Sequence, residues 1–140
     1  MLVIDDDVCL ARAVVRTLKD YEVAVETDPT SGVARVAGAD LDGDPFDVVL
    51  CDFRMPGMNG LEVLAAMRSQ QEPPITILMS GDDDVADAAR VADAVLLKPF
   101  RAREILDAID RIQAQRARTV TRRMRPMSVA TAEPSLHGRV

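Results

Sequence analysis

The stretch that decides the fold is Phe46-Asp-Val-Val-Leu-Cys-Asp-Phe-Arg-Met-Pro-Gly-Met-Asn-Gly60. Its four consecutive apolar residues, Val48 to Cys51, lack the alternation of a half-exposed strand, so they predict a strand buried on both faces of a parallel sheet. The strand ends in a carboxylate, Asp52, followed by a loop that contains Pro56 and Gly57. In open α/β sheets, ligands bind beyond the carboxyl ends of the strands. Asp52 is therefore the first candidate site residue.

Apolar runs alternate with amphipathic segments along the body of the chain. Strands are predicted at 2–4, 23–25, 48–51, 75–79 and 94–97, and a helix is predicted after each of them. Thr30 or Ser31 is expected to cap the second helix, which is predicted to end near Ala37. Five such units predict an α/β fold, the flavodoxin-like (βα)5 doubly wound parallel sheet with strand order 2-1-3-4-5.

The net charge of −6 hides an asymmetry along the 140 residues. Residues 1–115 carry 22 Asp or Glu and 11 Lys or Arg, whereas residues 116–140 carry six Arg and one Glu. The acidic charge of residues 1–115 argues against a nucleic-acid-binding domain. The two cysteines lack the spacing of metal ligands. No apolar run approaches the length of a transmembrane span. We therefore expect a cytoplasmic protein with no membrane contact. Its domain is predicted to cover residues 1–118, followed by a basic, disordered tail over residues 119–140.

Polar residues gather where the predicted strands end, namely Asp5, Asp6, Asp52, Ser80 and Lys98. Because all strands of a doubly wound sheet point the same way, these residues are expected to meet at one edge. Converging carboxylates need raised pKa values or a cation, and an all-oxygen set suits Mg²⁺. Lysine offers a point charge for phosphate, and serine offers a hydroxyl donor. Asp52 is then interpreted as the nucleophile that forms an acyl phosphate.

Four short motifs follow one another along the chain. They are Asp5-Asp6, Asp52-x-x-Met55-Pro56-x-x-x-Gly60, Ser80-Gly81 and Lys98-Pro99-Phe100. Over about residues 1–116, this ordered pattern resembles the receiver domain of two-component response regulators. The resemblance implies that Asp52 takes phosphate from a sensor histidine kinase or a histidine phosphotransfer protein, and that the domain then changes conformation to regulate a downstream protein. It also implies that the chain is not an enzyme beyond catalysing its own phosphorylation and dephosphorylation.

The resemblance assigns a role to each site residue. Mg²⁺ or Mn²⁺ is expected to bind Asp5, Asp6, Asp52 and the backbone carbonyl of Arg54. Ser80 and Lys98 are expected to contact the phosphoryl group, and the Lys98-Pro99 peptide bond is expected to be cis. Asp7 is left to cap the first helix.

Two features depart from the pattern of the family. Val95 stands where an aromatic residue often lies, and the segment from Ser80 to Val95 is shorter than usual by about one helical turn. Both changes fall on the face where receivers dimerise or bind targets, so an unusual output route is predicted. A further hypothesis pairs Arg54 with Asp82, because an ion pair there would shield the acyl phosphate from water.

Several alternatives stay open at this point. The chain is either a stand-alone receiver or a fragment of a larger hybrid kinase or response regulator, and a homodimer is not excluded. No DNA-binding domain is expected in this chain, since residues 119–140 are too few, although the arginines there allow binding to an anionic surface. A phosphohydrolase of the haloacid-dehalogenase type also uses a strand-end aspartate, but it needs a second one where Arg54 stands. A degenerate receiver that signals without phosphate ranks last.

Overall fold

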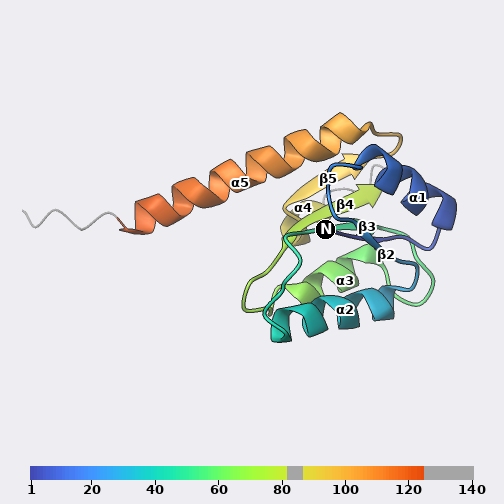
Figure 1. Cartoon of the computed structure of the whole chain (residues 1–140), viewed down its shortest axis with the longest axis horizontal. Helices are drawn as coiled ribbons and strands as arrows, with labels where there is room; N and C mark the ends of the chain where they lie inside the picture. Colours follow the sequence, from blue (N-terminus) through green and yellow to red (C-terminus); the bar gives the residue numbers. More distant parts are fainter. Residues whose placement is uncertain (82–86, 125–140) are drawn as a thin grey trace, which may run out of the picture.

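The computed structural model describes residues 1–81 and 87–124, and its centre is a five-stranded parallel sheet (Figure 1). The strands are β1 (Leu2–Ile4), β2 (Ala24–Glu26), β3 (Val48–Asp52), β4 (Ile75–Ser80) and β5 (Ala94–Leu97). Their order across the sheet is β2-β1-β3-β4-β5, so the predicted flavodoxin-like topology is confirmed. The predicted second strand is displaced by one residue, and the other four agree to within one residue at each end.

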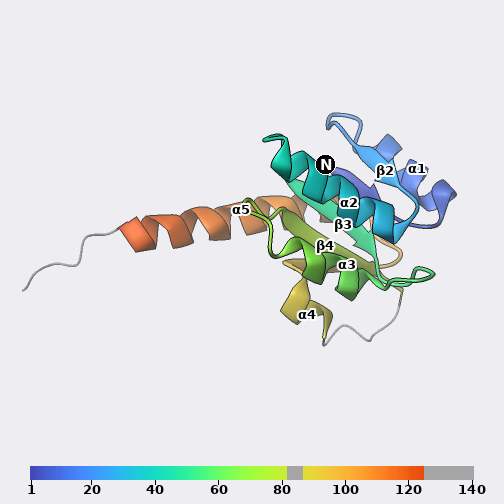
Figure 2. The ribbon, with the colours of Figure 1, turned by 90° about the horizontal axis from the view of Figure 1, so that it is seen from below.

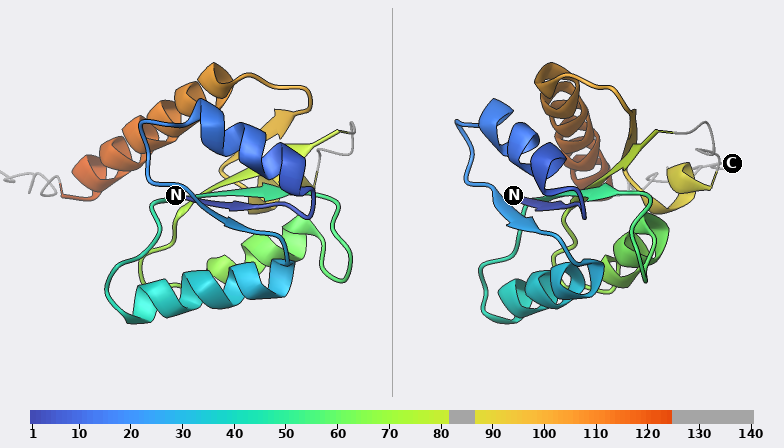
Figure 3. Two further views of the ribbon diagram at one scale, coloured as in Figure 1. Left: turned by 45° about the vertical axis from the view of Figure 1, so that its right-hand side comes forward. Right: turned by 90° about the vertical axis from the view of Figure 1, so that its right-hand side faces the viewer.

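Two layers of helices cover the sheet. The helices are α1 (Val8–Thr17), α2 (Pro29–Leu41), α3 (Gly60–Met67), α4 (Ala88–Val91) and α5 (Ala102–Met124). Figure 3 shows α1 and α5 on one face of the sheet and α2 and α3 on the other, where α4 also packs. The central strands are buried on both faces because each face has its own layer of helices, which explains their unbroken apolar runs.

Alternate residues of each strand supply the two halves of the core. In β4, Ile77 packs with α1 and α5, whereas its neighbour Leu78 packs with α2 and α3. In β3, Leu50 and Cys51 divide in the same way. Cys51 is therefore a buried strand residue, as predicted, and its burial raises the pKa of the thiol far above its ordinary value.

Helix starts were predicted with mixed success. Asp7 caps α1, since its side chain accepts hydrogen bonds from the backbone N–H groups two and three residues later, those of Cys9 and Leu10, at 2.9 and 3.1 Å. The prediction for α2 was wrong, because Asp28 is the cap: its carboxylate accepts from the backbone N–H of Ser31 at 2.8 Å. Pro29 then takes the first helical position, where its missing N–H costs nothing.

The predicted end of α2 near Ala37 was also wrong, because the helix continues to Leu41. The carboxylate of Asp40 accepts backbone N–H groups from Gln71 and Glu72 at 3.2 and 3.4 Å. This contact links the last turn of α2 to the loop after α3. A contact across more than thirty residues leaves no trace in the local hydrophobic pattern, so that pattern did not indicate a longer helix.

The last helix continues well past the predicted end of the domain. Residues 119–124 are helical, so the prediction of disorder was wrong for them, while residues 125–140 lie outside the described residues. The hydroxyls of Thr119 and Thr121 donate to backbone carbonyls one turn earlier, at 3.1 and 3.0 Å. Apolar periodicity fails there because this half of α5 projects from the body and has no face to bury (Figures 1 and 2). Within the described ranges, none of the helices has the length and apolar composition that crossing a bilayer requires.

Candidate functional site

The register of the strands brings the predicted site residues to one edge of the sheet. Ile4 of β1 pairs with Cys51 of β3, so the next residues, Asp5 and Asp52, lie side by side. Asp5 and Asp52 also point to the same face, since they continue the parity of Val3 and Leu50, which pack against α1 and α5. The convergence that was expected from strand polarity is therefore present.

Asp5, Asp6 and Asp52 form a cluster of carboxylates. Each offers an oxygen, and these oxygens lie within 4.8 Å of one another. Asp5 and Asp52 are buried, with 1% and 7% of their surface exposed, whereas Asp6 is exposed to solvent. The cluster thus combines two buried carboxylates with one that reaches solvent.

Asp5 is held in place through only one of its oxygens. Its Oδ1 accepts the backbone N–H of Asp7 at 2.9 Å, while the buried Oδ2 accepts no hydrogen bond from any described residue. Burial raises the pKa of Asp5 to about 6, and the charges of Asp52 and Asp6 add to this rise. The Asp7 hydrogen bond and the charge of Lys98 act against it. A buried carboxylate oxygen without a donor, next to two further carboxylates, fits a hard divalent cation.

Lys98 supplies the positive charge of the site. Its ammonium lies 2.7 Å from Oδ1 of Asp52 and 3.8 Å from Oδ2 of Asp5. The residue directly follows β5, its backbone N–H donates to the carbonyl of Ser80 at 2.7 Å, and the Lys98-Pro99 peptide bond is cis. One lysine thus faces two buried carboxylates, which leaves the site with an excess of negative charge.

Ser80 and Arg54 lie at the same edge. Ser80 is the last residue of β4, is 5% exposed, and directly follows Met79, which pairs with Asp52 in the sheet. Arg54 lies two residues after Asp52 in the loop, with an exposed side chain. The pairing of Arg54 with Asp82 is not tested, because Asp82 lies outside the described residues.

Gly60 explains why the loop after Asp52 has its shape. The N–H of Gly60 donates to the carbonyl of Phe53 at 2.8 Å, which closes the loop. A Cβ at Gly60 would collide with the backbone oxygen of Asp52 and would lie 2.6 Å from Cδ1 of Leu78. The sequence pattern contained this glycine, but the steric reason for it needed the folded chain.

Two further features near the site concern a helix cap that was not predicted and the departure from the family pattern at Val95. Asn59 caps α3 in a reciprocal capping box with Glu62, an Asn-x-x-Glu signal that the sequence displays and that was overlooked. Val95 is half-buried in β5, opposite Leu78, and packs with the α2 and α3 half of the core. The described part of α4 has only four residues.

Residues 1–110 match the family model described as "Response regulator receiver domain". "Response regulator ArlR" of Staphylococcus saprophyticus is 30% identical, over 78% of this chain and 50% of its own length. "DNA-binding response regulator MtrA" of Mycobacterium tuberculosis is 30% identical, over 95% of this chain and 57% of its own. The chain spans about half the length of these curated relatives.

Among solved structures, the chemotaxis response regulator CheY4 of Vibrio cholerae is similar in fold. It superposes with a TM-score of 0.66 at 28% identity, covering 79% of this chain and 95% of its own.

Proposed function

The chain belongs to the family of response regulator receiver domains, and on this premise we propose that Asp52 is the residue that accepts the phosphoryl group. One observation above all supports the proposal: Asp52 ends a buried strand with Lys98 at 2.7 Å and with Asp5 and Asp6 beside it. A carboxylate in that position has both a counter-charge and a ready cation site. Both are needed to bring an anionic phosphoryl group close to an anionic nucleophile.

Asp5, Asp6 and Asp52, with the backbone carbonyl of Arg54, are the groups that would hold Mg²⁺ or Mn²⁺. The Oδ2 of Asp5 supports this assignment, because it accepts no hydrogen bond from the described residues and has only the distant ammonium of Lys98, at 3.8 Å, as a counter-charge. A divalent ion bound there would neutralise charge on the phosphoryl group during its transfer.

The chain's own residues divide the remaining work. An oxygen of Asp52 forms a bond to phosphorus while the bond from phosphorus to the donor's imidazole nitrogen breaks, and that nitrogen keeps the electron pair. Lys98 lies close enough to Asp52 to pair with a phosphoryl oxygen once the carboxylate is esterified. Ser80 supplies a hydroxyl at the end of the neighbouring strand. We infer that the chain catalyses only its own phosphorylation on Asp52 and the later hydrolysis of that phosphoryl group.

The partners follow from the same reaction. The phosphodonor is a sensor histidine kinase or a histidine phosphotransfer protein in the cytoplasm, and the output is a change of conformation that regulates a protein partner. Because the relatives are about twice as long, the regulated partner is either a separate protein or a further domain of a longer regulator. Neither the site nor the comparisons favour the haloacid-dehalogenase alternative.

Acetyl phosphate with Mg²⁺, followed by electrophoresis in a phosphate-binding gel, tests the proposal directly. The wild-type chain is expected to show a retarded band that is absent in Asp52→Asn and absent when the metal is chelated. Asp107→Asn is a matched control, since Asp107 is an exposed carboxylate on α5 whose ion pair with Arg103 is weak at 3.8 Å. A wild-type band that does not shift, or a shift that persists in Asp52→Asn, would contradict the assignment.

A further inference from the structure

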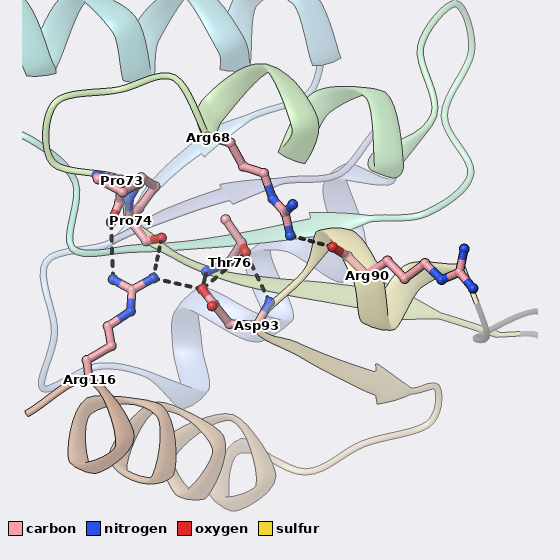
Figure 4. A network of polar contacts seen from close by, with 7 residues as sticks. All are labelled: Arg68, Pro73, Pro74, Thr76, Arg90, Asp93 and Arg116. Atoms are coloured by element: carbon pink, nitrogen blue, oxygen red, sulfur yellow. Dashed lines mark hydrogen bonds and ion pairs between the residues drawn. The ribbon is translucent and has the colours of Figure 1, made fainter. Parts of the chain in front are cut away.

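Arg116 binds three acceptors with one guanidinium group (Figure 4). It donates to the backbone carbonyls of Pro73 and Pro74, both at 3.1 Å, and to the carboxylate of Asp93 at 2.9 Å. The two prolines precede β4, and Asp93 precedes β5, so one side chain of α5 joins α5 to two other parts of the fold. We call Arg116, Asp93 and Thr76 the clamp.

Asp93 is itself anchored to the start of β4. The same Oδ2 that meets Arg116 accepts the backbone N–H of Thr76 at 2.9 Å and its hydroxyl at 3.3 Å. In return, the backbone N–H of Asp93 donates to the carbonyl of Thr76 at 2.9 Å. The turn between α4 and β5 is therefore held by one charge-assisted hydrogen bond from Arg116 to Asp93 and by the hydrogen bonds between Asp93 and Thr76. On the other side, Arg68 at the end of α3 donates to the carbonyl of Arg90 in α4 (Figure 4).

Arg116 lies where α5 leaves the body of the molecule. Up to Thr121, the last buried residue of α5 is Ile112, and each side chain from Gln113 to Thr121 is exposed. Among the described side chains, Arg116 is the last of α5 to form a hydrogen bond or ion pair with another element, and the helix beyond it projects into solvent (Figure 2). The direction of the projecting half therefore depends on the rigidity of the helix and on the clamp.

We propose that Arg116 is a positioning residue that couples the turn between α4 and β5 to the direction of the projecting half of α5. This inference rests on the proposed function for its input, because β4 runs from Thr76 of the clamp to Ser80 at the phosphoacceptor edge. A displacement of β4 shifts Asp93 through the hydrogen bonds that Asp93 makes with Thr76, and the guanidinium of Arg116 transmits the shift to α5. The clamp does not include Val95, so it offers an output route that needs no aromatic residue there.

Distances between spin labels on α1 and on the projecting half of α5 measure this coupling. Cys9 on α1 is exposed and Cys51 is buried, so labels attach to Cys9 and to a second cysteine introduced by Val120→Cys at an exposed position. Pulsed electron paramagnetic resonance then reports the mean distance and its spread in the full chain.

Three substitutions separate the clamp from general effects on α5. Arg116→Ala is expected to broaden the distance distribution about twofold, since three charge-assisted hydrogen bonds are lost. Asp93→Asn is expected to broaden it less, because the two proline carbonyls still hold Arg116. Arg118→Ala is the matched control. The side chain of Arg118 is exposed and forms no hydrogen bond or ion pair with any described residue, so the distance distribution should match that of the wild type. If Arg116→Ala gave the wild-type distance distribution, Arg116 would not hold the direction of the projecting half of α5. If Asp93→Asn gave the wild-type distribution, the turn between α4 and β5 would not be coupled to that direction.

Treatment with acetyl phosphate and Mg²⁺ tests whether phosphorylation of Asp52 changes the direction of the projecting half of α5. The wild-type distance is expected to shift, while Arg116→Ala, phosphorylated to the same extent, should show no matching shift. Equal shifts in both chains, or a shift in neither, would overturn the coupling even though phosphorylation succeeds. If the wild-type chain takes no phosphate, the proposed function fails. In that case the distance distributions of the unphosphorylated variants alone test whether Arg116 couples the turn to α5.

Discussion

Asp5, Asp6 and Asp52 place three carboxylates beside one lysine, and folding opposes the ionisation of the buried Asp5. The pKa of its carboxyl rises from 3.8 to about 6 on folding, chiefly because burial removes it from water. Below pH 3.8 the group is protonated in both states, so it has no effect on stability. Above about pH 6 it is ionised in both, and the folded chain carries the whole cost, on the order of 2–3 kcal/mol. This contribution therefore lowers stability as pH rises from about 4 to 6.

Asp5→Asn removes the titrating group and should reverse this effect. We expect the metal-free variant to be more stable than wild type at pH 7.5 by about 1–3 kcal/mol, with the difference shrinking at pH 4. Urea unfolding in a chelating buffer at the two pH values provides the measurement. Asp6→Asn is the control and should change the stability of the metal-free chain little, since Asp6 is exposed. Added Mg²⁺ should stabilise wild type and leave Asp5→Asn almost unchanged, and a wild type that is indifferent to Mg²⁺ would count against the metal site.

Lys98 competes with a cation for the same carboxylates, while it also serves the phosphoryl group. Lys98→Ala should therefore change two properties in opposite directions. Mg²⁺ should bind about 3- to 10-fold more tightly, because a positive charge 2.7 Å from Asp52 is removed. Phosphorylation by acetyl phosphate should slow by about tenfold or more. Calorimetric titration and gel retardation measure the two effects.

The chain contains a suitable control, because its other lysine, Lys19, is exposed. Lys19→Ala should change neither the affinity for Mg²⁺ nor the rate of phosphorylation. Weaker binding of Mg²⁺ by Lys98→Ala would show that Lys98 does not oppose the metal.

Among the elements, α3 depends on a glycine at its first position. The backbone oxygen of Asp52 and the side chain of Leu78 occupy the space that a Cβ on Gly60 would need. Gly60→Ala should therefore destabilise the fold by about 1–3 kcal/mol and move the loop next to Asp52. Thermal unfolding and the rate of phosphorylation report these two consequences.

A second glycine provides the opposite case. Gly38 lies in α2, and a Cβ there would meet nothing within 4 Å. Gly38→Ala should stabilise the chain by about 0.5–1 kcal/mol, because alanine loses less backbone entropy in a helix. If both substitutions changed stability equally, the close approach at Gly60 would not be what requires glycine.

For the molecule as a whole, the clamp suggests where the folded domain ends. We propose that residues 1–118 form the domain, because Arg116 is the last described side chain of α5 that forms a hydrogen bond or ion pair with another element. A chain ending at residue 118 should unfold at the same temperature as the full chain. A chain ending at residue 115 should lose about 1–2 kcal/mol, since it lacks the hydrogen bonds of Arg116. Equal stability of the two truncated chains would contradict this boundary.

Much of the fold was predictable because it depends on local signals. The apolar runs at 48–51 and 75–79 predicted buried strands, and Asp7 predicted the start of α1, since strand periodicity and helix capping involve residues close in sequence. Predictions failed where a distant contact decides. The last turn of α2 is joined to a distant loop by hydrogen bonds that the backbone N–H groups of Gln71 and Glu72 donate to the carboxylate of Asp40, and no local pattern records such a contact.

The common edge of Asp5, Asp52 and Lys98 follows from the order of residues alone, because parallel strands bring their carboxyl ends together whatever the details of packing. The burial of Asp5, the collision that requires Gly60 and the three acceptors of Arg116 depend on how the elements pack in the folded chain. Strand polarity is a property of the chain's local course, whereas desolvation, steric contact and hydrogen bonds across more than forty residues exist only once separate elements have packed.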